Sequence, residues 1–484
     1  MKSLQVKRKK QRFISDSSRV ITKFYSPGGK DRMKSIIRRV LSLSDAECQK
    51  TLMLVFEEFG DQHPNLGRAL VKHYQEIESL IESSEQLSHE RKLLLGSYFT
   101  QEYSVESAAL FNPSVVPHPD QDNLPEGSLR CILSFRAVGE GHISSIVFRC
   151  GILDEHNHFI MDPLRPFLET PIVEMNPTYD KRNFLVKLQE AGVYEQVCAR
   201  IFEKLPNRFL FNELKERIRE VGIAYPFSVA VRETIEMIFW VARSNYEASF
   251  PSHSYPSERV IFPVARNESN GIEDARFVKF TGDGGNICYY ATYTAYNGRT
   301  TLPMLLETRD FVRFKMCTLS GEAAKDRGMA LFPRKIRGKY MMVSQQDGEN
   351  LYIMSSDDIY FWNEARILHT PQQTWEFIQI GNCGSPIETE AGWLLLTYGV
   401  GPLRKYCIGI RLLDPDDPSK VLGNLEYPVI MPNEYEREGY VPNMVFTCGA
   451  LLHNDTLMIP YAVSDTTSGI ATIALKPLLE RLLQ

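Results

Sequence analysis

The sequence predicts a mainly β protein, a five-bladed β-propeller with an N-terminal α-helical region and a helical insertion. Hairpin-like pairs of apolar segments recur from about residue 129 to the end of the printed sequence. With the insertion set aside, their spacing is roughly 50 to 65 residues, which is the period of propeller blades. Two other blocks have apolar residues at three- and four-residue spacing, which is typical of helices.

Residues 1–100 are predicted to form the α-helical N-terminal region. Between about Asp31 and Phe99 the apolar residues follow a helical period, as in Ile36-Ile37-x-x-Val40-Leu41. Nothing in this region suggests catalysis, so we expect it to serve packing or oligomerisation. A basic arm precedes it and is interpreted as a disordered tail, with Lys7, Arg8, Lys9, Lys10 and Arg12.

Residues 101–484 are predicted to form the propeller, interrupted by the helical insertion at about residues 180–246. The first hairpin pairs residues 129–138 with residues 143–149 across Gly139-Glu140-Gly141. Four further hairpins follow the insertion, and they pair residues 289–296 with 301–308, 339–344 with 351–355, 392–399 with 406–411, and 455–461 with 469–475.

Length and composition limit the class of protein. The 484 residues are 43% hydrophobic and 24% charged, enough for a large core and an accessory domain. A net charge of −5 argues against nucleic-acid binding. The sequence has no apolar run of about 18 residues and no apolar stretch behind its basic start, so no membrane span or signal peptide is predicted. A cytoplasmic location is expected.

The cysteines predict neither disulfides nor a metal site. The chain holds nine of them, an odd number, with no C-x-x-C pair. Cys131, Cys150 and Cys288 lie in apolar runs and are predicted to be buried core thiols. No metal and no cofactor are predicted.

Polar residues near the ends of the predicted hairpins are the candidate site. The innermost strands of a propeller surround a central cavity, so these residues are expected to converge there. Carboxylates that converge on one pocket are what glycoside chemistry needs. The candidates are Arg136, Glu273, Asp274, Ser344, Gln345, Tyr398 and Asp465.

The segment that contains Glu273 and Asp274 resembles a known family. Gly271-Ile272-Glu273-Asp274-Ala275-Arg276 is similar to the G-x-E-D-P-R signature of glycoside hydrolase family 130, with Ala275 where proline is usual. The resemblance covers roughly Phe111 to the C-terminus, apart from the insertion. It extends through Tyr289-Tyr290-x-x-Tyr293-Thr294-Ala295-Tyr296, Leu331-Phe332-Pro333-x-Lys335-Ile336-x-Gly338-Lys339-Tyr340, Ile380-Gly381, Gly384-x-Pro386-Ile387-x-Thr389-x-x-Gly392-Trp393, Tyr435-Glu436 and Val441-Pro442-Asn443.

The resemblance implies a five-bladed propeller enzyme that cleaves β-mannosides with inversion, by phosphorolysis or by hydrolysis. Asp274 would be the proton donor, acting through a hydroxyl of the bound mannose, with Glu273 and Arg276 tuning its pKa in opposite directions. Arg136 matches a cavity arginine of the family, although a salt bridge between blades is the alternative. Asp465 matches an aspartate that holds mannose hydroxyls.

The identity of the nucleophile depends on departures from the family pattern. Family phosphorylases carry an asparagine beside a basic residue where this chain has Arg327-Gly328, and His-Arg where it has Ser344-Gln345. They carry a lysine at Gln379 and Tyr-His-Gly-Val at residues 397–400. A phosphate dianion needs several cationic or N–H partners. The loss of these residues favours hydrolysis.

A hydrolase of this kind needs a general base opposite Asp274, with the two carboxyl groups roughly 6.5 to 9.5 Å apart. Glu388 is the first candidate and Glu349 the second, with a turn cap or solvation as the alternative for Glu388. Tyr293 and Tyr398 are candidate sugar contacts, although tyrosines in strands also pack in cores. Arg327 and Gln379 complete the predicted substrate-binding set.

The sequence therefore predicts an inverting hydrolase for β-mannosides, with a β-1,2 linkage suggested by the family's hydrolases. A β-mannoside phosphorylase that releases mannose 1-phosphate and a non-catalytic carbohydrate-binding propeller are the alternatives. The predicted partner is an oligosaccharide substrate. Neither nucleic acid nor membrane is expected, and a homo-oligomer through the helical regions is possible.

Overall fold

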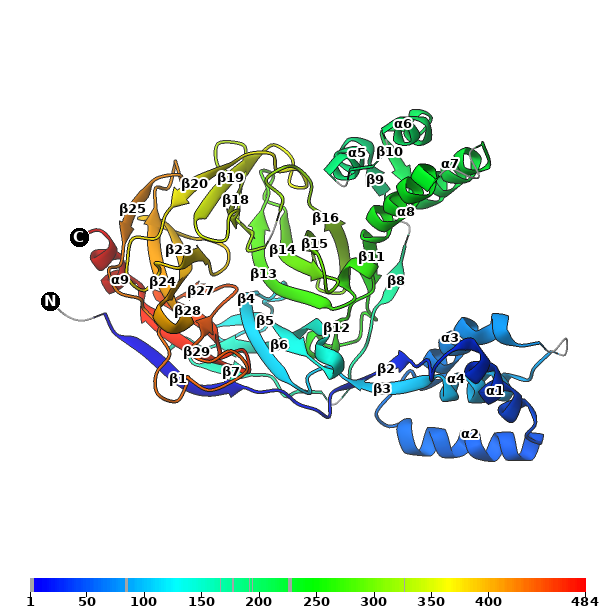
Figure 1. Cartoon of the computed structure of the whole chain (residues 1–484). Coiled ribbons are helices and arrows are strands. Elements are labelled where there is room, and N and C mark those ends of the chain that lie inside the picture. Colours follow the sequence, from blue (N-terminus) through cyan, green and yellow to red (C-terminus); the bar gives the residue numbers. More distant parts are fainter. Residues whose placement is uncertain are drawn as a thin grey trace. The chain divides into compact units, whose positions relative to one another are not determined.

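The computed structural model describes residues 4–82, 86–165, 167–175, 178–190, 192–193, 195–224, 229–325 and 327–484. The protein is mainly β, with two helical parts (Figure 1). It divides into two compact units. Unit 1 comprises Met1–Ser15, Ala108–Pro163 and Thr170–Gln484, and unit 2 comprises Asp16–Ser107 and Leu164–Glu169.

Unit 2 is a small helical unit with one strand pair. Its core includes Leu70, Leu94 and Phe99, each almost fully buried. Ser44 begins the second helix with a reciprocal cap, since its hydroxyl accepts from the Glu47 amide and the Glu47 carboxylate accepts from the Ser44 amide. The elements are β2 (Val20–Phe24), α1 (Lys30–Leu41), α2 (Asp45–Phe59), α3 (Leu66–Ile77), η1 (Glu78–Leu80), α4 (His89–Tyr98) and β3 (Thr100–Ser104).

The largest sheet of unit 1 consists of two antiparallel meanders. Strand pairing joins them where β6 and β13 run parallel, at Ser144 and Gly271. The first meander contains β4 (Ala109–Pro117), β5 (Leu129–Val138) and β6 (Ser144–Leu153), with β7 (Phe159–Met161) and β12 (Val260–Ile261) also paired to β6. The second contains β13 (Gly271–Thr281), β14 (Ile287–Tyr296), β15 (Thr301–Thr308), β16 (Arg313–Thr318), β11 (Tyr246–Ser249) and β8 (Ile172–Glu174).

Three smaller antiparallel sheets follow in chain order. The first contains β17 (Ala330–Leu331), β18 (Tyr340–Gln345), β19 (Leu351–Ser356) and β20 (Ala365–His369). The second contains β21 (Gln379–Asn382), β22 (Ile387–Thr389), β23 (Gly392–Gly401), β24 (Lys405–Leu413) and β25 (Val421–Asn424). The third contains β26 (Val445–Phe446), β27 (Leu451–His453), β28 (Thr456–Val463), β29 (Thr467–Ala474) and β1 (Val6–Phe13), and α9 (Leu475–Leu482) follows it.

All five predicted hairpins are confirmed. They are the antiparallel pairs β5–β6, β14–β15, β18–β19, β23–β24 and β28–β29. The prediction of a disordered basic tail is wrong, because β1 pairs with β29 from Val6 opposite Ile473 to Phe13 opposite Ser468. The backbone of this arm is therefore held by a strand from the other end of the chain.

In unit 1 each meander or sheet packs beside the one that follows it in the chain. The last sheet packs beside the first meander. Strand β13 packs beside β4, β14 beside β17, β18 beside β21, β24 beside β26, and β28 beside β4. The Cys448 amide donates to the Pro113 carbonyl at 2.8 Å. The Phe277 amide donates to the Ser114 hydroxyl at 3.1 Å. The first strands of different sheets are thus joined by hydrogen bonds.

The helical insertion has a core of its own. Phe184, Ile201, Leu214 and Ile238 are buried in it. Its elements are β9 (Thr178–Asp180), α5 (Lys181–Glu190), α6 (Glu195–Glu203), β10 (Arg208–Leu210), α7 (Phe211–Ala224) and α8 (Val229–Arg243). Helix α5 is attached to the sheets, because a carboxylate oxygen of Glu190 accepts from the Gly321 amide at 2.6 Å.

The cysteines and the helices bear on two further predictions. Cys131, Cys150 and Cys288 are buried free thiols, as predicted. Across the described ranges of the chain, the helices are too short or too polar to cross a membrane. The cytoplasmic location and the homo-oligomer stay predictions.

Candidate active site

Asp274 lies in a bulge of β13. The pairing of β13 with β14 shifts between Glu273 and Arg276, and Asp274 has a φ of +55°. A non-glycine residue with positive φ is uncommon and is often found at functional sites. Gly271 opens the same strand with a φ of +136°, and a Cβ there would lie 2.2 Å from the Ser144 hydroxyl. Glycine is therefore needed for the close approach of β13 to β6.

A second bulge, in β4, presents Asn112 to Asp274. Asn112 has a φ of +49° and lies where the pairing of β4 with β5 shifts. Its side-chain amide donates to Asp274 Oδ1 at 2.6 Å. Asn112 is only 4% exposed, and its Oδ1 is buried without a hydrogen-bond partner in the described part of the chain. Asn112 is not among the residues predicted from the sequence. The only local sequence feature at Asn112 is that it precedes Pro113, at the point where the helical pattern of the N-terminal region ends.

Arg136 of β5 connects the two adjacent carboxylates of β13. Its Nη2 donates to Glu273 Oε1 at 2.7 Å, and its Nη1 lies 3.6 Å from Asp274 Oδ1. Burial acts to lower the pKa of Arg136, but the negative charges of Asp274, Glu273 and Asp465 outweigh it and raise this pKa. The predicted convergence of these residues is therefore present in the structure. Among the described residues, the side-chain carboxylate of Asp274 accepts a hydrogen bond from Asn112 and faces the Arg136 guanidinium.

Asp465 joins this cluster from the turn between β28 and β29. It too has a positive φ, +53°. Burial, reinforced by the negative charge of Asp274, raises the pKa of Asp465 to about 7, although Arg136 and Arg404 oppose the rise. Its Oδ1 is buried without a hydrogen-bond partner among the described residues. Near neutral pH this carboxyl group is thus partly protonated and has an oxygen that a ligand can use.

Arg276 supplies buried positive charge two residues after Asp274. It is 4% exposed, and its Nη1 donates to the backbone carbonyl of Asp274 at 3.0 Å. Its Nε has no hydrogen-bond partner, and no carboxylate of the described residues lies within 4 Å of the guanidinium. Arg276 and the exposed Arg327 both line a cavity of about 10 Å³, which is room for about one water molecule. A buried arginine without a carboxylate partner is unusual and suits an anionic ligand.

Three neutral side chains form a chain of hydrogen bonds next to these arginines. The Gln379 side-chain amide donates to the Tyr398 hydroxyl at 2.9 Å, and this hydroxyl donates to Gln345 Oε1 at 3.1 Å. Burial raises the pKa of Tyr398, so the phenol stays neutral. Gln345, Gln379 and Tyr398 are therefore brought together as predicted, and they carry donors without charge.

The structure does not bring Glu388 to this cluster. Its side chain is 49% exposed and accepts from Arg334 Nε at 3.0 and 3.1 Å. On β22 it lies opposite Trp393, five residues along β23 from Tyr398, which corresponds to about 16 Å of strand. This correction has a topological reason, because β21 and β22 pair with different parts of β23. Glu388 is not positioned as a base opposite Asp274.

Glu349 and Tyr293 also differ from their predicted surroundings. Glu349 is exposed in the turn between β18 and β19, and its backbone carbonyl accepts from the Ile380 amide at 2.9 Å. The turn that carries Glu349 therefore lies beside the start of β21, where Gln379 is located. Tyr293 is a core residue, with its hydroxyl donating to the buried carboxylate of Glu268 at 2.9 Å. That hydroxyl is therefore already engaged by a buried carboxylate, while Tyr293 also lines the small cavity of Arg276 and Arg327.

No cluster of three or more histidine, cysteine, aspartate or glutamate side chains suited to a metal occurs in the part of the chain that the structure describes. Glu273 and Asp274 are both paired with Arg136. The arrangement offers a proton-transfer carboxyl group, an acceptor for sugar hydroxyls and a set of cationic N–H donors.

This set of carboxylates and arginines on a mainly β scaffold is typical of an enzyme that acts on carbohydrates, and the comparisons with known proteins identify its family. The family model of glycoside hydrolase family 130, described as β-1,4-mannooligosaccharide phosphorylase, matches residues 239–483. The chain belongs to this family.

The relatives that it resembles are named as phosphorylases. A 1,2-β-oligomannan phosphorylase of Thermoanaerobacter sp. (strain X514) is 33% identical over 247 residues, which cover 49% of this chain and 80% of the relative. A β-1,2-mannobiose phosphorylase of Listeria innocua is 26% identical over 373 residues, or 74% and 97% of the two chains. The solved structure of a Listeria innocua β-1,2-mannobiose phosphorylase in complex with β-1,2-mannobiose covers 78% of this chain and 93% of that one, with 21% identity and a TM-score of 0.46.

Proposed function

We propose that the protein is an inverting β-mannoside phosphorylase that releases mannose 1-phosphate, with a β-1,2-linked manno-oligosaccharide as substrate. The observation that carries this proposal is the buried Arg276, which has no carboxylate partner among the described residues and lies two residues from Asp274. A guanidinium in a buried setting binds a phosphate oxyanion through charge-assisted hydrogen bonds. The names of the relatives support the same reaction and linkage.

The proposed scaffold is a five-bladed β-propeller. The support is that five antiparallel meanders follow each other in the chain, each packed beside the next, with the last beside the first. Strand β1 adds an N-terminal strand to the C-terminal sheet, which ties the two ends of such a ring together. In this arrangement β4, β13, β17, β21 and β26 are the five innermost strands, and Asn112 and Asp274 face the central cavity.

In the proposed reaction Asp274 provides the proton. The family resemblance implies that the proton passes through a hydroxyl of the bound mannose to the glycosidic oxygen, whose bond to the anomeric carbon then breaks. Asn112 and Arg136 hold the Asp274 carboxyl group in position. Asp465 accepts hydrogen bonds from mannose hydroxyls. Phosphate, held by Arg276 and Arg327, attacks the anomeric carbon from the opposite face, so the new carbon–oxygen bond has inverted configuration.

Hydrolysis is the second candidate, and one observation favours it. Gln345, Gln379 and Tyr398 form an uncharged hydrogen-bonded chain where family phosphorylases carry cations. A water molecule would then replace phosphate as the nucleophile. Glu349 would be the base, since its turn lies at the Gln379 end of the sheet. Glu388 has no part in either proposal, because it is ion-paired with Arg334 on a different part of β23.

Product analysis separates the two reactions. Purified protein is incubated with β-1,2-mannobiose with and without inorganic phosphate, and mannose 1-phosphate and mannose are quantified. Phosphorolysis predicts one mannose 1-phosphate and one mannose per bond, and no turnover without phosphate. Equal rates with and without phosphate, and mannose alone as product, would overturn the proposal in favour of hydrolysis.

The same assay tests the role of Asp274. Asp274→Asn removes the transferable proton and is expected to abolish turnover while the circular dichroism spectrum and the melting temperature stay close to those of the wild type. Unchanged turnover would remove Asp274 from its role. If the wild type binds mannosides without converting them under either condition, the protein is a carbohydrate-binding module instead.

A further inference from the structure

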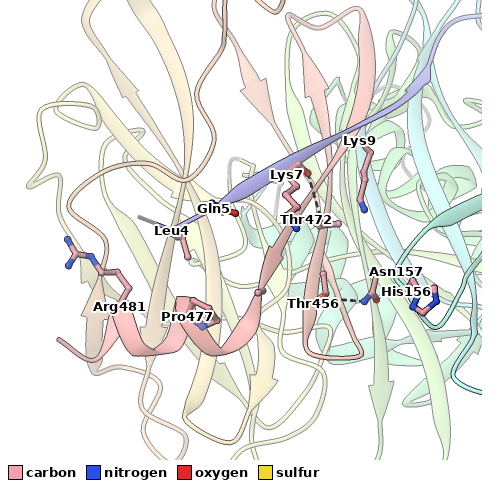
Figure 2. Close-up of a pocket in the computed structure, with 11 residues that line it drawn as sticks. Leu4, Gln5, Lys7, Lys9, His156, Asn157, Thr456, Thr472, Pro477 and Arg481 are labelled. Atoms are coloured by element: carbon pink, nitrogen blue, oxygen red, sulfur yellow. Dashed lines mark hydrogen bonds between the residues drawn. The ribbon is translucent and has the colours of Figure 1, made fainter. Parts of the chain in front are cut away.

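The basic arm lines a second cavity far from the Asp274 cluster. This cavity has a volume of about 690 Å³ and lies between β1, the turn after β6, the hairpin of β28 and β29, and α9 (Figure 2). Thr456 and Ala474 pair at the open end of that hairpin, whereas Asp465 lies in its turn. Seven residues of strand separate the two ends, a distance of about 20 Å. The cavity is therefore separate from the proposed reaction centre.

The side chains of β1 alternate between two environments. Arg8 points to one face, where its guanidinium binds the buried carboxylate of Glu436 at 3.1 Å. Lys7 and Lys9 belong to the other face and line the cavity, as Figure 2 shows. Among the described residues no carboxylate lies within 4 Å of either ammonium group. The arm thus neutralises one buried acid on one side and leaves two positive charges on the other.

The rest of the lining adds to this positive character. Arg481 of α9 also lines the cavity, as does His156, whose Nε2 lies 3.5 Å from Glu155 Oε1. No aspartate or glutamate is among the described residues that line it. Asn157 donates to the Thr456 hydroxyl at 3.1 Å, and its own Oδ1 is buried without a hydrogen-bond partner in the described part of the chain. Lys7 and Lys9 line the same cavity, and two like charges repel each other unless an anion lies between them. The whole chain carries a net charge of −5, so this local excess opposes the overall balance.

We propose that this cavity binds a small phosphorylated molecule, separate from the phosphate that the proposed reaction consumes. The cavity volume is in the range of small-molecule sites. The two lysines and Arg481 offer the donors that phosphate groups need, and Thr456 and Thr472 offer hydroxyl donors and acceptors beside them. The ligand touches β1, α9 and the turn after β6 at once, so its binding holds the N-terminal strand to the C-terminal sheet.

Inorganic tripolyphosphate is the probe for the test. Binding is measured by isothermal titration calorimetry and by the melting temperature from tryptophan fluorescence, because a ligand that binds only the folded state raises that temperature. The test variant is Lys7→Gln/Lys9→Gln. The matched control is Lys10→Gln, which changes an exposed lysine of the same strand that does not line the cavity. Arg276→Gln controls for binding at the proposed reaction centre.

The wild type, Lys10→Gln and Arg276→Gln are expected to bind with similar dissociation constants and similar increases in melting temperature. The double variant is expected to bind about tenfold more weakly or worse. Arg481→Gln provides an independent variant on another element if the double variant does not fold, and it too is expected to weaken binding.

Two results would overturn the proposal. One is the same affinity in the wild type and in the variants of Lys7, Lys9 and Arg481. The other is no binding up to about 10 mM tripolyphosphate, beyond the millimolar range of weak ligands. Tighter binding of a short DNA duplex than of tripolyphosphate, lost in the same variants, would replace the small molecule by nucleic acid. Failure of this proposal leaves the phosphorolysis assay unaffected, since that assay reports on the other site.

Discussion

Replacing Asp465 by asparagine tests the electrostatics of the cluster. The pKa of Asp465 rises from an ordinary value of 3.8 to about 7 in the folded protein. The folded state therefore holds this proton more tightly than the unfolded chain does, and the resulting stabilisation is complete below pH 3.8 and lost as the pH rises to 7. A shift of about 3 pKa units, at 1.36 kcal/mol each, corresponds to about 4 kcal/mol. Asparagine does not ionise, so the Asp465→Asn variant does not lose this stabilisation as the pH rises.

The measurement is urea denaturation of wild type and Asp465→Asn between about pH 4 and pH 8. All four tryptophans lie in unit 1, so their fluorescence follows the unit that contains Asp465 and not the helical unit 2. The free energy of unfolding of the wild type is expected to fall relative to that of the variant by up to about 4 kcal/mol over this range. Asp122→Asn, at an exposed position, is the control, and its difference from the wild type is expected to stay within about 0.5 kcal/mol. A difference for Asp465→Asn that is flat across the range would refute the assignment of a raised pKa.

Three further substitutions test the site. Arg276→Gln removes a charged donor to phosphate, so the KM for phosphate is expected to rise about tenfold or more and the KM for the mannoside to change less. Both constants are measured from initial rates. Equal effects on the two constants would argue against phosphate binding by Arg276. Asn112→Asp replaces the donor to Asp274 by a negative charge, so the pH profile of kcat/KM is expected to shift to higher pH. An unshifted profile would mean that Asn112 does not influence the ionisation of Asp274 during catalysis. Glu388→Ala is expected to leave kcat/KM within about twofold and to cost less than about 1 kcal/mol of stability, because its ion pair is exposed; a large loss of activity would restore Glu388 to the site.

The hairpins could be predicted because their signals are local. In the pair 392–399 and 406–411, two apolar runs flank a short turn, and the structure pairs them from Trp393 to Gly401. The basic arm was misinterpreted for the opposite reason. Its partner strand, β29, lies at the far end of the chain, and a run of lysines and arginines carries no local sign of such a partner. The carboxylate of Glu436 is buried and needs a positive partner, and Arg8 supplies it. This contact becomes visible only in the folded structure.

The proximity of Arg136 to Glu273 and Asp274 was predicted from the family motif, but a neighbour that depends on tertiary contact was missed. Asp274 and Arg136 were found from sequence, but the donor to Asp274 comes from Asn112, 162 residues earlier in the chain. Its place depends on β4 lying beside β13 and on two bulges with positive φ. Glu388 shows the converse. It lies a few residues from Gln379 in sequence, but β21 and β22 pair with different parts of β23, so proximity in sequence does not become proximity in space.

The uncharged chain of Gln345, Gln379 and Tyr398 allows the choice of nucleophile to be tested by a gain of function. Gln379→Lys restores the lysine that family phosphorylases carry at this position, next to the Tyr398 hydroxyl. A partly exposed charge about 5 Å from a bound anion contributes about 1 kcal/mol, or about a fivefold change in affinity. If Arg276 and Arg327 already bind phosphate, the KM for phosphate is expected to fall about fivefold, with Gln379→Met, which is uncharged, as the matched control. A lysine that leaves the KM for phosphate unchanged, in a variant that still cleaves the mannoside, would mean that the anion binds elsewhere or that water is the nucleophile.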